Sequence, residues 1–220
     1  MVLPSVMSTA ALLFGVSACS GDNDGTEEPS LTTSQVCDST LDSSASAALK
    51  RVGDTDEFTE LPGANDSGEP SKFSLKRSAS TIHKDPTQRN QCVVFKSGDK
   101  TGHPLIDVDF SAEKSSPNPD SSTESDDSDQ AFYSMGTYAK SNRNISALLY
   151  FKCSTQDPDD PKNSTSYIRS SLTTAGQLSP ETRGRDLMTI LNSVAGALAE
   201  QLGCASQAAL PTQVPKAEAG

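Results

Sequence analysis

The spacing of its cysteines limits the folds open to this sequence more than any other feature does. Of the five cysteines among 220 residues, one ends an apolar N-terminal run, and the other four are Cys37, Cys92, Cys153 and Cys204. An even number of cysteines in an exported chain is typical of a disulfide framework. Because only 34% of the residues are hydrophobic, we expect two disulfides to stabilise one modest core.

The N-terminal segment has the pattern of an export signal. Residues 1–18 contain no charged side chain, and an apolar run gives way to the small residues Ser17 and Ala18. The run is too short to cross a hydrocarbon core of about 30 Å comfortably, and Pro4 disfavours a long helix. We therefore expect a signal peptide over residues 1–18 rather than a buried core helix. Residues 1–11 lack the Lys or Arg that a signal peptide usually carries near its start, so the sequence leaves open whether the true start lies upstream.

Residues Val16-Ser17-Ala18-Cys19 resemble a bacterial lipobox. The resemblance implies that the Cys19 thiol accepts a diacylglyceryl group and that the signal peptide is cut before Cys19. Two acyl chains would anchor the protein stably at the outer face of the cell membrane, which a single chain does not achieve. The alternative is ordinary signal-peptidase cleavage after Ala18, which would give a secreted protein. We favour the lipid anchor.

Composition predicts the domain plan. Residues 19–35 are rich in Ser, Thr, Asp and Glu, which predicts a disordered tether after the lipidated cysteine. Residues 36–204 supply one compact domain with a mobile acidic loop at 112–130, and residues 205–220 form a frayed tail. The layout resembles the small, uncharacterised surface lipoproteins of actinobacteria. That resemblance implies a cell-envelope location and supplies no active-site residues.

The net charge of −11 argues against one class of partner. An acidic surface repels nucleic acid and anionic lipid headgroups, and no cluster of Lys and Arg counters it in the sequence. We expect no nucleic-acid partner, and we expect the only membrane contact to be the lipid on Cys19. We also expect a monomer.

Hydrophobic periodicity predicts an α+β domain. A short helix is expected from Asp42 to Gly53, and a longer one from an N-cap at Ser179 to Gly203. Six β-strands are expected between them, over Phe73–Ser80, Gln91–Lys96, Pro104–Ser111, Phe132–Ala139, Ile145–Cys153 and Ser166–Thr173. We therefore predict one antiparallel sheet of about six strands with the two helices packed on a face.

The sequence leaves the disulfide pairing open. A local pairing of Cys37 with Cys92 and Cys153 with Cys204 ties a helix end to a strand in each half. The rival pairing joins Cys92 to Cys153 across the sheet and Cys37 to Cys204 between the helices. We favour the local pairing, in which each bond closes a loop of about 50 residues and contributes roughly 4 kcal/mol by chain entropy.

Motifs for catalysis are scarce. The sequence contains no nucleophile elbow, phosphate-binding loop, dinucleotide fingerprint or Cys-x-x-Cys pair. His103, Asp107 and Asp109 would share one face of a strand and would suit a metal or acid/base site, but a solvated strand face explains them better. The acidic runs around Asp126 and Asp159 lack the spacing of a calcium loop. We predict no catalytic residue, no metal and no cofactor.

These observations favour one function over two alternatives. We expect a membrane-anchored, extracytoplasmic, non-enzymatic lipoprotein that binds a small ligand or an envelope protein. One alternative is a hydrolase or metal-dependent enzyme that uses His103, Asp107 and Asp109. The other is a structural surface protein without a ligand, which would lack a cavity or an exposed apolar patch.

Overall fold

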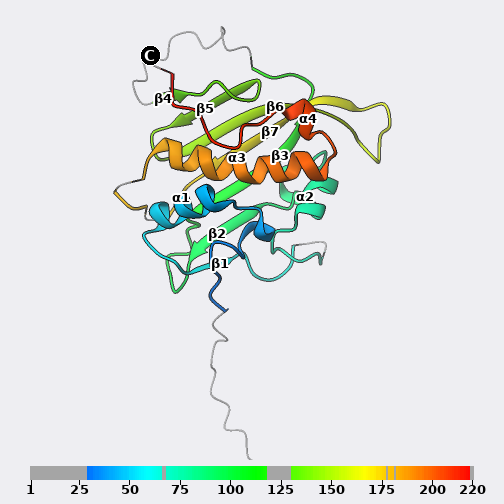
Figure 1. The fold of residues 1–220 in the computed structure, drawn as a ribbon. Helices are drawn as coiled ribbons and strands as arrows, with labels where there is room; N and C mark the ends of the chain where they lie inside the picture. The colour runs from blue at the N-terminus through cyan, green and yellow to red at the C-terminus, as the bar shows by residue number, and fades with distance from the viewer. Residues whose placement is uncertain (1–28, 66–67, 118–129, 177, 181, 219–220) are drawn as a thin grey trace, which may run out of the picture.

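The computed structural model describes residues 29–65, 68–117, 130–176, 178–180 and 182–218 (Figure 1). Within them the chain forms one α+β domain, which confirms the predicted fold class. The predicted signal peptide, the lipidation site Cys19 and residues 20–28 of the tether lie outside the described residues. Most of the acidic loop predicted at 112–130 also lies outside them.

One antiparallel sheet of seven strands organises the domain. In chain order the strands are β1 Phe58–Glu60, β2 Cys92–Lys96, β3 Ile106–Glu113, β4 Gln130–Phe132, β5 Tyr138–Asn142, β6 Ser146–Gln156 and β7 Ser164–Thr173. Their spatial order is β1-β2-β3-β7-β6-β5-β4, so β1 and β4 form the two edges. The centre of the sheet pairs β3 with β7 and β7 with β6, which are the longest strands.

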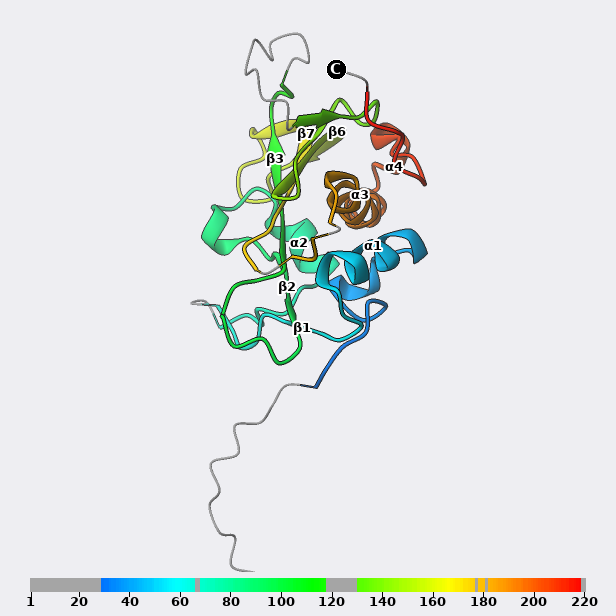
Figure 2. The ribbon, with the colours of Figure 1, turned by 90° about the vertical axis from the view of Figure 1, so that its left-hand side faces the viewer.

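Helices cover one face of the sheet. The helical elements are the 3-10 turn η1 Cys37–Ser39, α1 Ser43–Gly53, α2 Leu75–Thr81, the 3-10 turn η2 Pro86–Gln88, α3 Gly184–Gln201 and α4 Ala205–Ala208. Helices α1, α3 and α4 lie on the same side of the sheet, with α1 packed beside α3 (Figure 2). The apolar stripe of α3 is fully buried at Leu187, Ile190, Leu191, Val194 and Leu198. The core therefore lies between α3 and the inner face of the sheet.

Local sequence patterns account for several elements. The carboxylate of Asp42 accepts a hydrogen bond from the backbone N of Ala45 at 2.8 Å, which is the N-cap that the sequence predicts for α1. Along β3, apolar residues are buried and the alternating aspartates are half-buried, as expected for a strand that covers a core on one face.

Two disulfides join the helical layer to the sheet. Cys37 is bonded to Cys92 and Cys153 to Cys204, with Cα–Cα distances of 5.4 Å and 5.3 Å. This is the local pairing favoured from the sequence. The first bond connects η1 to β2, and the second connects β6 to the residue before α4.

The predicted strand at Phe73–Ser80 is wrong, because this segment contains the helix α2. The backbone N of Leu75 donates to the carboxylate of Asp38 at 2.9 Å, so a residue 37 positions earlier caps the helix. The local residue Ser74 makes no side-chain capping bond. A distant cap leaves no local signal, and weak alternation was therefore a poor guide here.

The predicted strand at Phe132–Ala139 is interrupted. β4 ends at Phe132 and β5 begins only at Tyr138, after a bend that contains Gly136 at φ +59°. A Cβ on Gly136 would lie 2.3 Å from the backbone O of Tyr150, so this bend requires glycine. This split and β1 add two strands, and the loss of the predicted strand at Phe73–Ser80 removes one, so the sheet has seven strands where about six were expected.

Helix α3 begins five residues later than the predicted N-cap at Ser179. The backbone N of Thr182 donates to the O of Ser179 at 3.0 Å, which closes a turn ahead of the helix. Arg183 is the N-cap, and its backbone N donates to the Asp186 carboxylate at 3.1 Å. Because Asp186 rather than Ser179 satisfies the free backbone groups, the helix starts at Gly184.

Both ends of the compact domain extend further than predicted. Leu31 exchanges two backbone hydrogen bonds with Phe58 at 2.7 and 2.9 Å, so ordered structure begins inside the segment expected to be a tether. At the other end, residues 205–218 are packed rather than frayed. Val214 is 4% exposed, and its carbonyl accepts a hydrogen bond from Arg185.

Candidate ligand-binding site

The residues of the predicted enzyme alternative do not converge. His103 is exposed and lies in the loop before β3, outside the strand. Asp109 accepts two hydrogen bonds from the guanidinium of Arg89, at 2.9 and 2.7 Å, so an ion pair occupies it. Burial, and secondarily the charge of Asp109, raise the pKa of Asp107.

One group of potential metal ligands does converge among the described residues, and it does not include His103. The ligand atoms of Cys37, Glu60 and Cys92 lie within 4.8 Å of one another. The two sulfurs are bonded to each other, and a disulfide does not supply thiolates to a metal.

The domain has features of an exported protein. Its two disulfides support an extracytoplasmic location, since such bonds persist in oxidising compartments. None of the helices formed by the described residues is long and apolar enough to cross a membrane.

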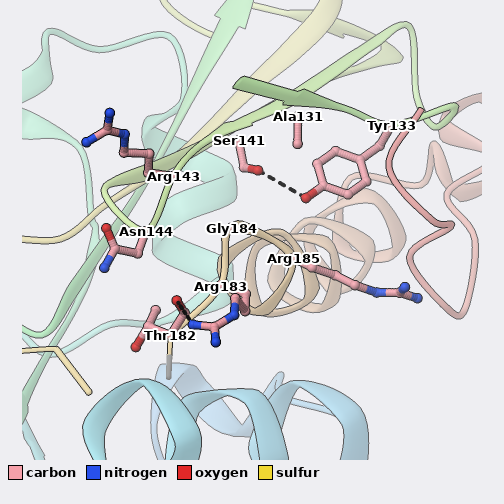
Figure 3. Close-up of a pocket in the computed structure, with 9 residues that line it drawn as sticks. All are labelled: Ala131, Tyr133, Ser141, Arg143, Asn144, Thr182, Arg183, Gly184 and Arg185. Carbon is pink, nitrogen blue, oxygen red and sulfur yellow. Dashed lines mark hydrogen bonds between the residues drawn. The ribbon is translucent and has the colours of Figure 1, made fainter. Parts of the chain in front are cut away.

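A cleft of about 330 Å³ lies where α3 begins beside β4 and β5 (Figure 3). Its lining consists of Ala131, Tyr133, Ser141, Arg143, Asn144, Thr182, Arg183, Gly184 and Arg185. Three of these nine residues are arginines and none is acidic. In a chain with a net charge of −11, this lining is unusual.

Gly184 brings the first turn of α3 against β5. A Cβ at this position would lie 2.4 Å from the Oγ of Ser141 and 2.5 Å from the backbone O of Arg143. No side chain fits at these distances, so glycine is required for the close approach. The helix start therefore forms one wall of the cleft and the end of β5 the other.

Hydroxyl groups contribute to the cleft from both sides. The hydroxyls of Tyr133 and Ser141 are hydrogen-bonded to each other at 3.0 Å. Thr182 is only 4% exposed, and its Oγ1 has no hydrogen-bond partner among the described residues. An unpartnered buried hydroxyl costs free energy, so a ligand group that satisfies it would be favoured.

The arginines of the helix start are bonded only to neutral acceptors. Arg183 donates to the backbone oxygens of Pro180 and Thr182, and Arg185 donates to the backbone oxygen of Val214 at 2.7 Å. No ion pair among the described residues engages Arg183 or Arg185. In Figure 3, the side chains of Arg143 and Arg185 extend in opposite directions, with Arg183 between them. The guanidinium charges of Arg183 and Arg185 are not neutralised by an acid among the described residues and are therefore available to an anion.

The acidic residue in the first turn of α3, Asp186, is already neutralised. The Oδ1 of Asp186 accepts hydrogen bonds from Arg51 at 2.6 and 3.1 Å, and its Oδ2 accepts one from the backbone N of Arg183. Asp186 does not line the cleft. Since a helix start also carries positive partial charge, the electrostatics of the cleft favour negatively charged groups.

Sequence reasoning missed this site. Arg143 and the pair Arg183 and Arg185 are separated by 40 residues, and no motif links them. The only local signal is the Arg-Gly-Arg tripeptide at 183–185, in which a glycine opens a helix. Comparison with known proteins adds nothing further, because no protein-family model, curated protein or solved structure matches the chain.

Proposed function

We propose that this protein is a membrane-anchored, extracytoplasmic lipoprotein that binds a small anionic ligand in the cleft beside α3, without catalysing a reaction. The lipobox-like motif ending at Cys19 and the two disulfides support the location. The observation that carries the ligand class is that the described residues lining the cleft include three arginines and no acid, in a strongly acidic chain.

The chemistry of the cleft favours an oxyanion. Guanidinium groups pair with the oxygens of carboxylate, phosphate or sulfate through charge-assisted hydrogen bonds. The hydroxyl of Thr182 and the amide of Asn144 add neutral partners along the same lining. A volume of about 330 Å³ admits a small molecule rather than a folded partner.

The residue types that line the cleft support a binding role over an enzymatic one. None of the nine lining residues is a histidine, a cysteine or an acid, so the cleft offers no general base with a pKa near neutrality. Of the three residues of the alternative site, Asp109 is paired with Arg89, and His103 lies in the loop before β3.

The proposal is tested by titrating the domain with inorganic phosphate, sulfate and acetate at low ionic strength, with affinity measured by NMR. Replacing Arg183 with Ala keeps the backbone cap of α3 and removes one guanidinium. We expect the affinity to fall roughly tenfold, as the loss of one charge-assisted hydrogen bond implies.

The matched control removes equal positive charge elsewhere. Lys76→Ala and Lys100→Ala alter exposed lysines outside the cleft lining. We expect each of these variants to bind phosphate within about twofold of wild type, since exposed charges are screened. Equal weakening in Arg183→Ala and in the lysine variants would mean that the anion follows net charge only, and the proposed site would be wrong.

A further inference from the structure

The chain after α4 forms a strap that runs back along α3 toward the cleft. This strap comprises residues 209–218, which form neither helix nor strand. In Figure 1, where it is drawn in red, it passes from α4 toward the edge strand β4. The strap is packed against the domain, since the side chain of Val214 is buried at 4% exposure and belongs to the hydrophobic core.

Two side chains of α3 hold the strap against the helix. The Nδ2 of Asn192, near the middle of α3, donates a hydrogen bond to the backbone O of Pro211 at 2.8 Å. The guanidinium of Arg185, in the first turn, donates to the backbone O of Val214 at 2.7 Å. The strap therefore runs antiparallel to α3 and reaches the helix start at Val214, where it offers Arg185 a neutral acceptor.

The far end of the strap is attached to β4. The backbone N of Glu218 donates to the O of Phe132 at 2.9 Å, and the carboxylate of Glu218 accepts a hydrogen bond from the hydroxyl of Ser134. Phe132 lies between Ala131 and Tyr133, which both line the cleft. The strap is therefore attached to two of the elements that form the cleft, α3 and β4.

Arg185 is the residue that the strap and the cleft share. It lines the cleft, and it also lines a neighbouring pocket of about 350 Å³ formed by α1, α3 and the strap. In Figure 3 its side chain extends away from Arg183, in the direction opposite to Arg143. Because the guanidinium of Arg185 donates to Val214, this carbonyl holds it on the strap side of the cleft.

We propose that the strap is an autoinhibitory element of the anion site: the carbonyl of Val214 competes with the anion for the guanidinium of Arg185, and a bound anion that recruits Arg185 loosens the strap. This inference rests on the proposed function, whose ligand affinity the strap would regulate. The donors of a guanidinium lie in one rigid plane, so a group turned toward Val214 does not pair fully with an anion beside Arg183. An oxyanion is the stronger acceptor, because it adds the attraction of its negative charge to the hydrogen bond.

Val214→Ala tests the strap without changing the net charge. The smaller side chain weakens the packing of the strap, so the carbonyl competes less well for Arg185. We expect phosphate to bind about threefold more tightly than to wild type, as judged by NMR titration at low ionic strength. Unchanged or weaker binding would overturn the proposal.

Val93→Ala is the matched control. Val93 is buried at 8% exposure in β2, and it lines neither the cleft nor the pocket beside the strap. The same loss of two methyl groups there destabilises the domain without touching the strap. We expect this variant to bind phosphate within about 1.5-fold of wild type, since distant and independent sites do not couple. A gain equal to that of Val214→Ala would overturn the proposal.

Arg185→Ala shows whether the strap acts through this guanidinium. In that background Val214→Ala should no longer change phosphate affinity, because the group for which the carbonyl competes is gone. A gain that persists without Arg185 would overturn the proposal. If Val214→Ala does not fold, Ser134→Ala replaces it, since this exposed hydroxyl bonds Glu218 at the far end of the strap. Its loss should tighten phosphate binding about twofold, and no gain would overturn the proposal.

The reciprocal effect is measured in the wild-type protein. Saturating phosphate should speed hydrogen exchange of the Glu218 amide about threefold, because coupling between two sites acts equally in both directions and this amide bonds Phe132 only while the strap is attached. Saturable phosphate binding at the cleft, with no effect of Val214→Ala and no change at the Glu218 amide, would overturn this inference and leave the proposed function standing. Absence of saturable binding in wild type and in every variant would overturn both.

Discussion

Three consecutive residues with positive φ begin at Cys37, one half of the first disulfide. Cys37, Asp38 and Ser39 have φ angles of 51°, 56° and 60°, a conformation that costs roughly 1–2 kcal/mol per non-glycine residue. The turn is stabilised by the bond to Cys92 and by the hydrogen bond from the Cys37 N–H to Glu60. Asp38 in turn caps α2. Glu60 therefore has a structural role in this turn.

The titration of Glu60 should make stability depend on pH. Its folded-state pKa lies above the ordinary value of 4.5, mainly because of burial. Its contribution to stability is therefore fully present below that value and is lost as pH rises through the folded pKa. We expect the stability of Glu60→Gln relative to wild type to increase between pH 4 and pH 8, as measured by urea denaturation. A difference independent of pH would contradict a raised pKa.

Gly184 is the residue whose replacement should damage the cleft most. A Cβ there would meet Ser141 at 2.4 Å, so Gly184→Ala should lower the free energy of unfolding by about 1–3 kcal/mol through overpacking. Gly196, in the same helix, has no neighbour within 4 Å of such a Cβ. Gly196→Ala should raise stability by roughly 0.5–1 kcal/mol, since alanine favours a helix. Thermal denaturation of both variants tests the contrast, which a similar loss in both would contradict.

At the scale of elements, local sequence signals predicted the helices and strands whose cap or buried face is formed by their own residues. The Asp42 cap of α1, the alternation of β3 and the apolar stripe of α3 were all readable from the sequence. α2 was missed because its cap comes from Asp38, and the start of α3 was misplaced because Asp186 competes with Ser179. A contact with a distant segment decided the first case, and a capping contact within the first turn of α3 decided the second.

The cleft could not be predicted for the same reason. Arg143 and Gly184 become neighbours only because the end of β5 approaches the start of α3. Neither the register of the strands nor that approach is encoded in a local motif. The disulfide pairing was easier to predict from the sequence than the cleft, since each bond joins elements within one half of the chain.

Removing the second disulfide should destabilise the junction of β6 with α4. The double variant Cys153→Ala/Cys204→Ala opens a loop of 51 residues. We expect the free energy of unfolding to fall by about 2–5 kcal/mol, the usual range for a native disulfide in a small exported domain. Urea denaturation measures the loss. A cross-linked peptide that contains Cys92 and Cys153 in non-reducing mapping would contradict the pairing itself.

At the scale of the whole molecule, the first described residues and the cleft lie at opposite edges of the sheet. The described chain begins at Pro29, and Leu31 pairs with Phe58 beside the β1 edge (Figure 1). The cleft is lined by Ala131 of β4 and Ser141 of β5, at the other edge. If the predicted lipid on Cys19 anchors the protein, the cleft lies at the edge of the sheet farther from the anchored end of the chain.

Anchoring depends on Cys19 in this account. Cys19→Ser should release the protein into the medium or leave an unprocessed precursor in the membrane, because the lipid acceptor is lost. Metabolic labelling with a fatty-acid analogue should mark wild type and not the variant. Unlabelled wild-type protein cut after Ala18 would favour the secreted alternative.

The central claim is that the start of α3 and the end of β5 form a binding site for an anion. Its most direct test is an amide-resolved titration of the ¹⁵N-labelled domain with inorganic phosphate at low ionic strength. We predict saturable shifts that are largest at Thr182, Gly184 and Arg185, which line the cleft. Shifts that do not saturate, or that are largest at exposed lysines such as Lys76 and Lys100, would contradict the account.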